Sequence, residues 1–321
     1  MKLRRNRRAL QHRVVSIVLL AGPLLSQEPR FVGANACKVC HPGQFEKQSA
    51  STHAGSLRRV ADHPLNAAFS SNLSSRKPAV GWAFGAGTQA VTFVSRWDGD
   101  HYLEHRLSWY PALKALSVTP GHDSHKEPGA LYRIFEPSAR ILRCFQCHST
   151  GRLQVSEQGE IQPAEVGVRC ETCHGPGGDH RSIVNPQKYS AAEINQLCGS
   201  CHRKPAAAGD DTDFQNTWNV RHQPLYLAES ACFLKSAGKL SCLTCHDAHS
   251  GRAQNACAGC HPSVKHPAKI QAARRTCEAC HMPAVSPRPG LKFANHWIGV
   301  FGANKLVPVG QRRGVASRAA R

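Results

Sequence analysis

The chain has 321 residues, 41 Lys and Arg against 21 Asp and Glu, a formal net charge of +20, and 15 cysteines. This cysteine content is well above that of an ordinary globular enzyme, so cysteine chemistry is the first question. The charge alone does not indicate a nucleic-acid partner, because six basic residues lie in the first 26 and their removal leaves about +14.

The N-terminus is typical of an export signal. The basic stretch "MKLRRNRRALQHR" precedes mostly apolar residues 14–25, which are too few to span a bilayer and contain Pro23. We expect residues 1–26 to be a signal peptide, with a retained anchor as the alternative. No second apolar run approaches spanning length. The predicted location is periplasmic or otherwise extracytoplasmic, with no stable membrane span after cleavage.

Seven copies of C-x-x-C-H follow along the chain and use fourteen of the fifteen cysteines, leaving Cys232. Two thiols at this spacing on one helical turn can add to the two vinyl groups of a haem. The predicted attachment residues are Cys37, Cys40, Cys144, Cys147, Cys170, Cys173, Cys198, Cys201, Cys242, Cys245, Cys257, Cys260, Cys277 and Cys280. The predicted proximal iron ligands are His41, His148, His174, His202, His246, His261 and His281.

The predicted cofactors are therefore seven covalently bound haem c groups. Zinc ribbons also use C-x-x-C pairs, but they do not require a histidine after every pair. A disulfide array leaves the repeated histidine unexplained as well. Seven haems would carry about fourteen propionates, which would offset the basic surplus of the mature chain.

Sixth iron ligands must come from the remaining histidines, because the chain has only two methionines. Bis-histidine ligation of most haems is expected, and it favours low potentials within the range of about 0.8 V that axial ligands control. His246 and His249 are three residues apart, which on a helix would place both on one face. Since axial ligands approach iron from opposite faces, His249 should serve a neighbouring haem. A solvated surface histidine is the alternative.

The segment between the first two motifs predicts strands. "TQAVTFVSRWDGDHYLEHRLSWY" alternates apolar and polar residues around Asp98 and Gly99, which favours a hairpin, and "LKALSVT" suggests a third strand. We expect a first haem segment at residues 27–79, a small β-sheet at 80–120, a multihaem α domain at 121–302 and a mobile basic tail at 303–321. Cys232 is expected to be buried and inert.

Motif starts only 15 and 20 residues apart leave little room for a conventional core between them. Haem faces would then form the apolar interior. The predicted fold is an α-rich, loop-heavy multihaem cytochrome c with a small β-sheet insert near the N-terminus and a core of stacked haems.

Several stretches resemble the multihaem cytochrome c family that includes the tetrahaem electron acceptor of hydroxylamine oxidation. They are "FVGANACKVCHPGQFEKQSASTHAGSL", "LRCFQCHSTG", "GVRCETCHGPGGDH", "SACFLKSAGKLSCLTCHDAHS" and "CEACHMP" with "FANHWIGV". The resemblance implies distal iron ligands at His53, His180, His249 and His296, and less firmly at His222 and His266. This chain departs from that relative in having seven motifs rather than four. It also lacks the C-x-x-C-K motif of pentahaem nitrite reductases.

Two functions remain open from the sequence. The favoured one is an exported electron-transfer protein whose partners are redox proteins or a quinol-linked donor. The alternative is an oxidoreductase that acts on a small nitrogen or sulfur compound at one five-coordinate haem. The haem of His148 is the candidate for that role, because only His122 and His125 offer themselves as weak distal ligands. If these two instead face an open iron, they become candidate proton donors.

Overall fold

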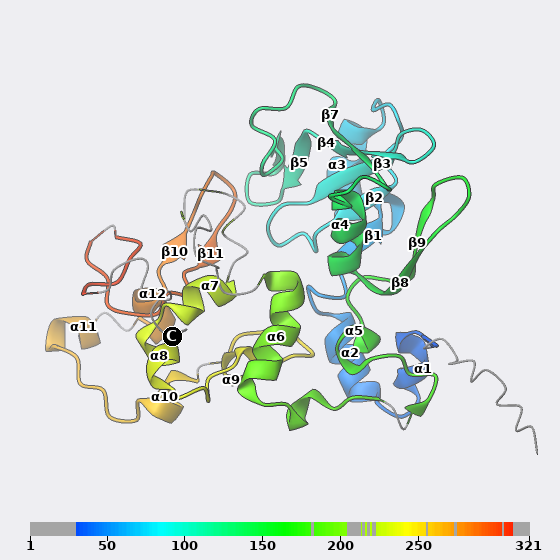
Figure 1. Ribbon diagram of the computed structural model, residues 1–321. Coiled ribbons are helices and arrows are strands. Elements are labelled where there is room, and N and C mark those ends of the chain that lie inside the picture. Colours follow the sequence, from blue (N-terminus) through cyan, green and yellow to red (C-terminus); the bar gives the residue numbers. More distant parts are fainter. Residues whose placement is uncertain are drawn as a thin grey trace, which may run out of the picture.

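The computed structural model describes residues 30–180, 183–203, 213, 216, 219, 223–254, 256–272, 275–303 and 305–310. The predicted signal peptide, His222 and residues 311–321 lie outside these ranges. Figure 1 shows a strand-rich part that carries β1 to β9 above a band of short helices. Within the described residues, no helix has both the length and the apolar character needed to cross a membrane.

The main sheet has five antiparallel strands in the order β1-β2-β3-β4-β7. The strands are β1 (Leu57–Arg59), β2 (Trp82–Phe84), β3 (Thr92–Arg96), β4 (His101–His105) and β7 (Gly129–Arg133). The hairpin predicted around Asp98 and Gly99 is confirmed, because β3 pairs with β4 and Gly99 takes the positive φ of 48° that its turn requires. The sheet also extends on both sides of the predicted 80–120 range.

Three two-stranded sheets complete the β structure. They pair β5 (Leu107–Tyr110) with β6 (Ala115–Val118), β8 (Ser149–Val155) with β9 (Ile161–Val166), and β10 (Ala284–Val285) with β11 (Phe293–Ala294). The predicted third strand "LKALSVT" therefore forms, but it pairs with β5 outside the main sheet. The last two sheets lie in the part that we expected to be α-rich and loop-heavy. An α-rich fold is thus too narrow a description, because the chain combines short helices with several small antiparallel sheets.

The β8–β9 hairpin was missed because its strands are half exposed. Leu153 and Val155 alternate with the polar Arg152 and Gln154, and the burial follows this alternation. Gly159, at φ 75°, allows the turn that joins the two strands. The alternation of a strand was present in the sequence, but the neighbouring haem motifs favoured helix.

The helices are short, as expected between closely spaced motifs. They are α1 (Ala34–Lys38), α2 (Pro42–Ser49), α3 (Asn66–Leu73), α4 (Arg140–His148), α5 (Cys170–His174), α6 (Ala191–His202), α7 (Gln223–Ala228), α8 (Ala231–Lys235), α9 (Cys242–Cys245), α10 (Cys257–Cys260), α11 (Ala268–Ala272) and α12 (Cys277–His281), with 3-10 turns η1 (Val60–Asp62) and η3 (Pro186–Lys188). Every C-x-x-C pair except the first lies wholly on a helix, so its two thiols are one helical turn apart.

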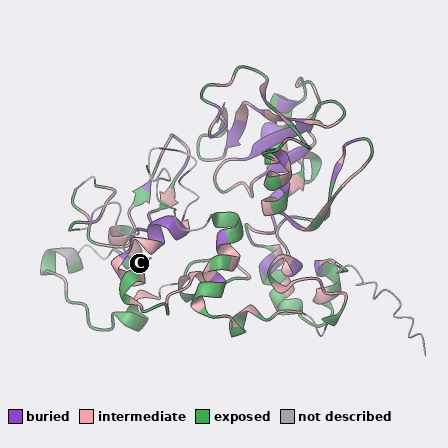
Figure 2. Ribbon diagram, in the orientation of Figure 1, coloured by how far each residue is buried: buried purple, intermediate pink, exposed green. Residues whose placement is uncertain are grey.

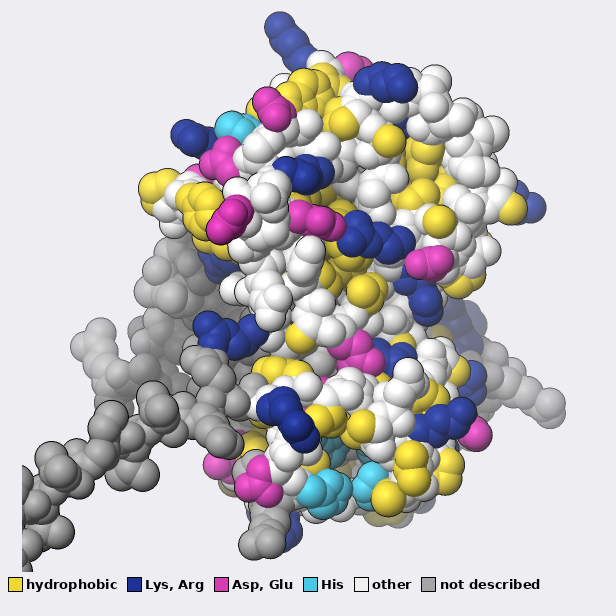
Figure 3. Space-filling view, turned by 90° about the vertical axis from the view of Figure 1, so that its right-hand side faces the viewer, with side chains coloured by type: hydrophobic (Ala, Val, Ile, Leu, Met, Phe, Trp, Pro, Cys, Tyr) yellow, Lys and Arg dark blue, Asp and Glu magenta, His cyan; other side chains and the backbone are white. Residues whose placement is uncertain are grey.

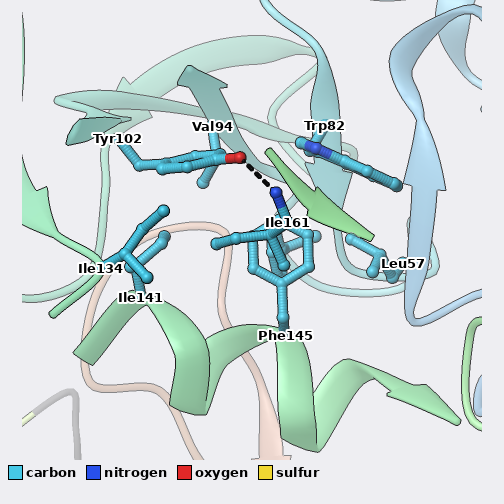
Figure 4. Close-up of a cluster of buried hydrophobic side chains, with 9 residues drawn as sticks. Leu57, Trp82, Val94, Tyr102, Ile134, Ile141, Phe145 and Ile161 are labelled. Atoms are coloured by element: carbon cyan, nitrogen blue, oxygen red, sulfur yellow. Dashed lines mark hydrogen bonds between the residues drawn. The ribbon is translucent and has the colours of Figure 1, made fainter. Parts of the chain in front are cut away.

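The largest apolar core lies between the main sheet and α4 (Figure 4). Phe145 on α4 is fully buried and meets Trp82, Phe84 and Tyr102 edge to face. The Tyr102 hydroxyl donates to Gly159 O at 3.2 Å and accepts from Ile161 N at 2.8 Å, which fixes the β8–β9 hairpin against the sheet. A second cluster around Phe69 and Phe93 involves residues of α3, β2, β3 and β5.

The band of helices has little core of its own. Buried side chains gather in the strand-rich part in Figure 2, whereas the helices that carry the later motifs are mostly exposed or intermediate. Among the described residues of 170–281, the buried hydrophobic side chains are Ile194, Leu225, Tyr226 and Leu227. This part of the polypeptide does not supply the apolar interior that a domain of its size requires.

The first part of the segment predicted to be a mobile tail, residues 305–310, packs on the rest of the chain. Leu306 and Val307 pack against a cluster formed by Leu225, Tyr226, Val285 and Trp297, and Asn295 Nδ2 donates to Leu306 O at 2.8 Å. Residues 305–310 therefore belong to the folded part of the chain. The sequence did not indicate this contact, because Leu306 and Val307 are two apolar residues in a segment rich in Gly and Arg.

Replacing Phe93 should destabilise the strand-rich part. Phe93 is fully buried, with its ring centre 5.0 Å from that of Phe69. We expect Phe93→Ala to lower the free energy of unfolding by about 3–5 kcal/mol, because it removes buried area and leaves a cavity. Urea unfolding followed by far-ultraviolet circular dichroism measures this change. The control is Leu131→Ala on β7, whose residue is 49% exposed and which should change stability by less than about 0.5 kcal/mol. Equal effects of the two substitutions would contradict the assignment of this core.

Candidate functional site

All fifteen cysteines lie in the described residues, and no disulfide joins any two of them. In the six motifs after the first, the histidine either closes its helix or directly follows it, whereas α1 ends at Lys38 and His41 immediately precedes α2. Cys232, expected to be buried, is only half-buried. Burial nevertheless raises the pKa of its thiol, which keeps it protonated and weakly reactive.

Five of the seven proximal histidines face a second histidine from another part of the chain. The pairs and the distances between their ring centres are His41 with His180 at 6.4 Å, His202 with His53 at 6.0 Å, His174 with His249 at 6.3 Å, His246 with His296 at 6.3 Å and His281 with His266 at 6.0 Å. Each second histidine is one that the sequence singled out as a probable distal ligand. The sixth such residue, His222, lies outside the described residues.

The distance between the ring centres in each pair matches that of two imidazoles bound to opposite sides of one metal ion. A metal–nitrogen bond is about 2.0–2.1 Å long, and the ring centre lies about 1.1 Å beyond the nitrogen. Two imidazoles on opposite sides of one metal ion therefore have ring centres about 6.2 Å apart. Two rings in direct stacking contact lie closer, as the 4.5 Å between His122 and His125 illustrates. The five pairs therefore fit an iron atom between them.

Hydrogen bonds at Nδ1 orient several of these rings. His148 Nδ1 lies 2.9 Å from Ser56 O, His174 Nδ1 2.9 Å from Val184 O, His281 Nδ1 2.8 Å from Gly299 O and His296 Nδ1 3.0 Å from Ala294 O. Since a carbonyl oxygen only accepts, Nδ1 carries the proton and Nε2 keeps the lone pair that binds a metal. His148 also meets the edge of Phe84, with ring centres 5.3 Å apart.

Burial favours the neutral form of three of the second histidines. Burial lowers the pKa of His53 and, with smaller effects from neighbouring charges, that of His249. The pKa of His296 falls to about 4, mainly through burial. Neutral imidazole is the form that binds a metal, so these sites are prepared for ligation at neutral pH.

His246 and His249 face different partners, but not for the reason inferred from their spacing. Helix α9 ends at Cys245, and His246 takes φ −116° and ψ 135°, which is extended backbone. The two rings are therefore not on one helical face. His246 faces His296, and His249 faces His174 from the preceding motifs.

The weak candidates His122 and His125 lie elsewhere in the fold. They stack on each other, and His122 Nε2 is 3.0 Å from Glu104 Oε2. Neither is placed opposite a proximal histidine by a ring contact of the kind found in the five pairs. His63 and His105 use both ring nitrogens in hydrogen bonds to protein groups, which leaves them no lone pair for a metal.

Thiols of different motifs lie near one another. The neighbouring pairs are Cys37 with Cys170, Cys147 with Cys201, Cys198 with Cys242, and Cys257 with Cys277. Cys173 lies close enough to Cys198 and Cys201, and Cys245 to Cys260, for their charges to interact. Helices α1 and α5 contact each other, as do α6 and α9. These contacts connect all seven motifs into one continuous group.

Two glutamates that the sequence did not single out fix the start of α1, one from α5 and one from β9. The buried carboxylate of Glu171 accepts from Gly33 N at 2.8 Å, Val32 N at 3.0 Å and Gly177 N at 2.6 Å. Glu165 accepts from Ala34 N at 3.0 Å. Glu171 is a variable residue inside "CETCH", and nothing in that motif indicates that its side chain reaches back to residues 32 and 33.

The exposed surface of the helical band combines histidine and apolar side chains. Figure 3 shows histidine rings beside hydrophobic residues on the lower part of the face viewed from the side of α1.

Two protein families match parts of the chain. Residues 162–262 match the cytochrome c3 family, and residues 114–175 match the family of cytochrome c554 and c-prime. The chain is also 26% identical over 171 residues to the multiheme cytochrome MtrA of Shewanella baltica (strain OS185). That alignment covers 44% of this chain and 45% of MtrA, so the match spans just under half of this relative.

Two solved structures share the fold. The outer cell wall cytochrome OcwA superposes with a TM-score of 0.53 at 16% identity, over 84% of this chain and 79% of OcwA. The undecaheme cytochrome from the S-layer of Carboxydothermus ferrireducens superposes with a TM-score of 0.50 at 18% identity, over 85% of this chain and 52% of that one. Taken with the motifs, these similarities show multiple covalent haem c groups.

Neutralising Glu171 should loosen the N-terminal motif. In Glu171→Gln an amide group would face backbone N–H donors, at a cost of about 1–3 kcal/mol to the local structure. Hydrogen exchange at the amides of Val32 and Gly33 should accelerate. The matched control is Glu278→Gln, at the same position of "CEACH", which should leave these amides protected. Unchanged exchange in both variants would contradict the clamping role of Glu171.

Proposed function

We propose that this multihaem c-type cytochrome, related to the cytochrome c554, MtrA and OcwA proteins, carries seven haems and passes electrons along them. The fourteen motif cysteines form thioether bonds to the haems, and the histidine that ends each motif is the proximal iron ligand. Haems 1 to 7 are numbered here by motif, beginning at Cys37, Cys144, Cys170, Cys198, Cys242, Cys257 and Cys277.

The observation that carries this proposal is the set of five histidine pairs, each spaced so that one iron atom fits between the two rings. On this reading His180 completes haem 1, His249 haem 3, His53 haem 4, His296 haem 5 and His266 haem 7. Two axial imidazoles close both faces of an iron, which suits electron transfer and excludes substrate. His222 remains the sixth expected distal ligand.

The sparse core of the helical band supports haems as its interior. Few apolar side chains are buried between α5 and α12 in the described residues, although the short helices hold a defined arrangement. Haem faces would supply the missing apolar surface. The basic surplus of the chain would offset their propionates.

The thiol contacts support an order for the electron path. A thioether sulfur is bonded to the edge of its macrocycle, so two sulfurs that lie near each other bring two haem edges together. These proximities support a path through haems 1, 3, 4, 5, 6 and 7. Haem 2 joins this path at haem 4, through Cys147 and Cys201, and in this order it stands beside the path.

An extracytoplasmic location fits this function. The relatives are named for the outer cell wall and the S-layer, and the N-terminus of this chain has the pattern of an export signal. We propose redox proteins or a quinol-linked donor as the partners that exchange electrons with its terminal haems.

Haem counting and electron paramagnetic resonance test the proposal. Mass spectrometry should find seven covalent haems on the intact protein, and the oxidised protein should give low-spin ferric signals from the paired sites. A high-spin signal that shifts on adding nitrite or hydroxylamine would instead favour the oxidoreductase. Fewer than seven haems would contradict the stoichiometry.

Removing one distal ligand should change one haem. His249→Ala should convert haem 3 alone to a high-spin ferric form, because His249 faces His174. His63→Ala is the control, since both nitrogens of His63 bond to protein groups and its loss should leave all spin states unchanged. A high-spin signal from haem 5, or none at all, would refute the pairing.

Removing haem 4 should interrupt the path, whereas removing haem 2 should not. A photoreductant coupled to Gly43→Cys, an open position beside the first motif, would inject electrons next to haem 1, with Cys232→Ser present throughout. In Cys198→Ala/Cys201→Ala, transient absorption should show reduction confined to haems 1 and 3. In Cys144→Ala/Cys147→Ala, reduction should still reach haems 5 to 7. The opposite outcome would refute the branched order.

A further inference from the structure

A cavity of about 270 Å³ lies in the strand-rich part, where the segment after α3 meets the end of β4, the start of β5 and the segment before β7. Its volume is close to the lower end, about 300 Å³, of the range for small-molecule sites. No motif cysteine and no histidine of the five pairs is among the residues that line it. The cavity is therefore separate from the predicted haem ligands.

The Arg76 guanidinium in the wall of this cavity has no anionic partner. Its Nη1 donates to His105 Nδ1 at 3.3 Å, whereas its Nε is buried without a hydrogen-bond partner. In the described part of the chain, no carboxylate forms an ion pair with it. Burial lowers the pKa of Arg76, because the positive charge is partly removed from water. An anion in the cavity would offset the cost of burying this unpaired charge.

His105 and Ser95 hold the guanidinium in place. Since arginine only donates, Nδ1 of His105 accepts, and its Nε2–H donates to Ser95 Oγ at 2.7 Å. Ser95 Oγ in turn donates to Pro78 O at 3.2 Å. Burial lowers the pKa of His105 to about 4, so the ring is neutral at neutral pH and continues to accept from Arg76. The guanidinium is thus positioned before a ligand arrives, which lowers the entropy cost of binding.

The rest of the wall combines polar and apolar groups. Lys77 supplies a second positive charge, and its exposed side chain forms no ion pair with a described residue. Asn72 and Ser75 supply an amide and a hydroxyl whose hydrogen-bonding capacity is not used by other described side chains. Leu107 and Pro128 add apolar surface. The wall therefore offers donors for a charged head and apolar contacts for a short carbon chain.

One acid, Glu127, limits the charge that the cavity accepts. Its carboxylate also lines the wall, and Arg106 Nη1 lies 3.5 Å from its Oε1. Glu127 is near enough to Arg76 to act on the guanidinium in the direction opposite to burial, raising the pKa of Arg76. Two cations thus face one acid that Arg106 partly balances. A singly charged ligand suits this arrangement better than a doubly charged phosphate does.

We propose that this cavity binds a small organic carboxylate. The carboxylate oxygens accept from Arg76 and Lys77, and the planar fork of the guanidinium matches the geometry of a carboxylate. The short carbon chain of the ligand contacts Leu107 and Pro128. This binding site is independent of the proposed electron transfer, since it uses no haem ligand.

Equilibrium dialysis of the full-length, haem-loaded protein against radiolabelled butyrate tests the proposal. Binding should be saturable, with one site per chain, and the neutral analogue butyramide should not compete. Arg76→Gln should weaken butyrate binding by about ten- to a hundredfold, because it removes charge-assisted hydrogen bonds. The matched control is Arg133→Gln on β7, whose side chain is 65% exposed and pairs with Asp100 away from the cavity; its affinity should be unchanged.

Two further variants leave the hydrogen bond between Arg76 and His105 in place. Lys77→Gln should weaken butyrate binding by about two- to fivefold, and Glu127→Gln should tighten it by a similar factor, because the first removes an attracting charge and the second a repelling one. Far-ultraviolet circular dichroism checks that each variant keeps its fold.

Three outcomes would overturn the proposal. They are the absence of saturable butyrate binding, unchanged affinity in folded Arg76→Gln and Lys77→Gln, and weaker binding in Glu127→Gln. Displacement of butyrate by a lower concentration of inorganic phosphate would overturn the assignment of the ligand as a carboxylate.

Discussion

Histidine pairs spaced to hold an iron atom between their rings link distant parts of this chain. The arrangement of the helical band depends on them. His53 faces His202, and His41 faces His180, so residues before the main sheet meet residues after it. His246 meets His296 across fifty residues in the same way. If each pair holds an iron, ligation cross-links the segments, and folding of the helical band becomes inseparable from haem attachment.

The protein therefore uses two kinds of interior. The strand-rich part has a conventional core, in which Phe145, Tyr102 and Trp82 interlock between the sheet and α4. The helical band has few buried apolar side chains in the described residues and depends on its cofactors for apolar surface. Helix α4 belongs to both, because its apolar face packs on the sheet while it also carries Cys144, Cys147 and His148. The motif on α4 therefore adjoins side chains of the sheet, as the contact between His148 and Phe84 illustrates.

The sheet also carries a hydrogen-bonded cluster apart from the five histidine pairs. The half-buried Glu104 carboxylate accepts from the buried His122 and from the half-buried Tyr132. Of the two histidines that the sequence offered as weak iron ligands, His122 bonds to Glu104, and His125 stacks on His122 with ring centres 4.5 Å apart.

The sequence by itself indicated the attachment sites, because C-x-x-C-H brings two thiols and an imidazole together and needs no distant residue. It also determined the β3–β4 hairpin through the turn at Asp98 and Gly99, and the short helices through the spacing of the motifs. The six probable distal histidines came from a family resemblance. Only the tertiary structure decided which of them meets which proximal ring, since those contacts span tens of residues and leave no local pattern. The reach of Glu171 to residues 32 and 33, the β8–β9 hairpin and the sheet-side cluster at Glu104 depend equally on packing between segments that are remote in the chain.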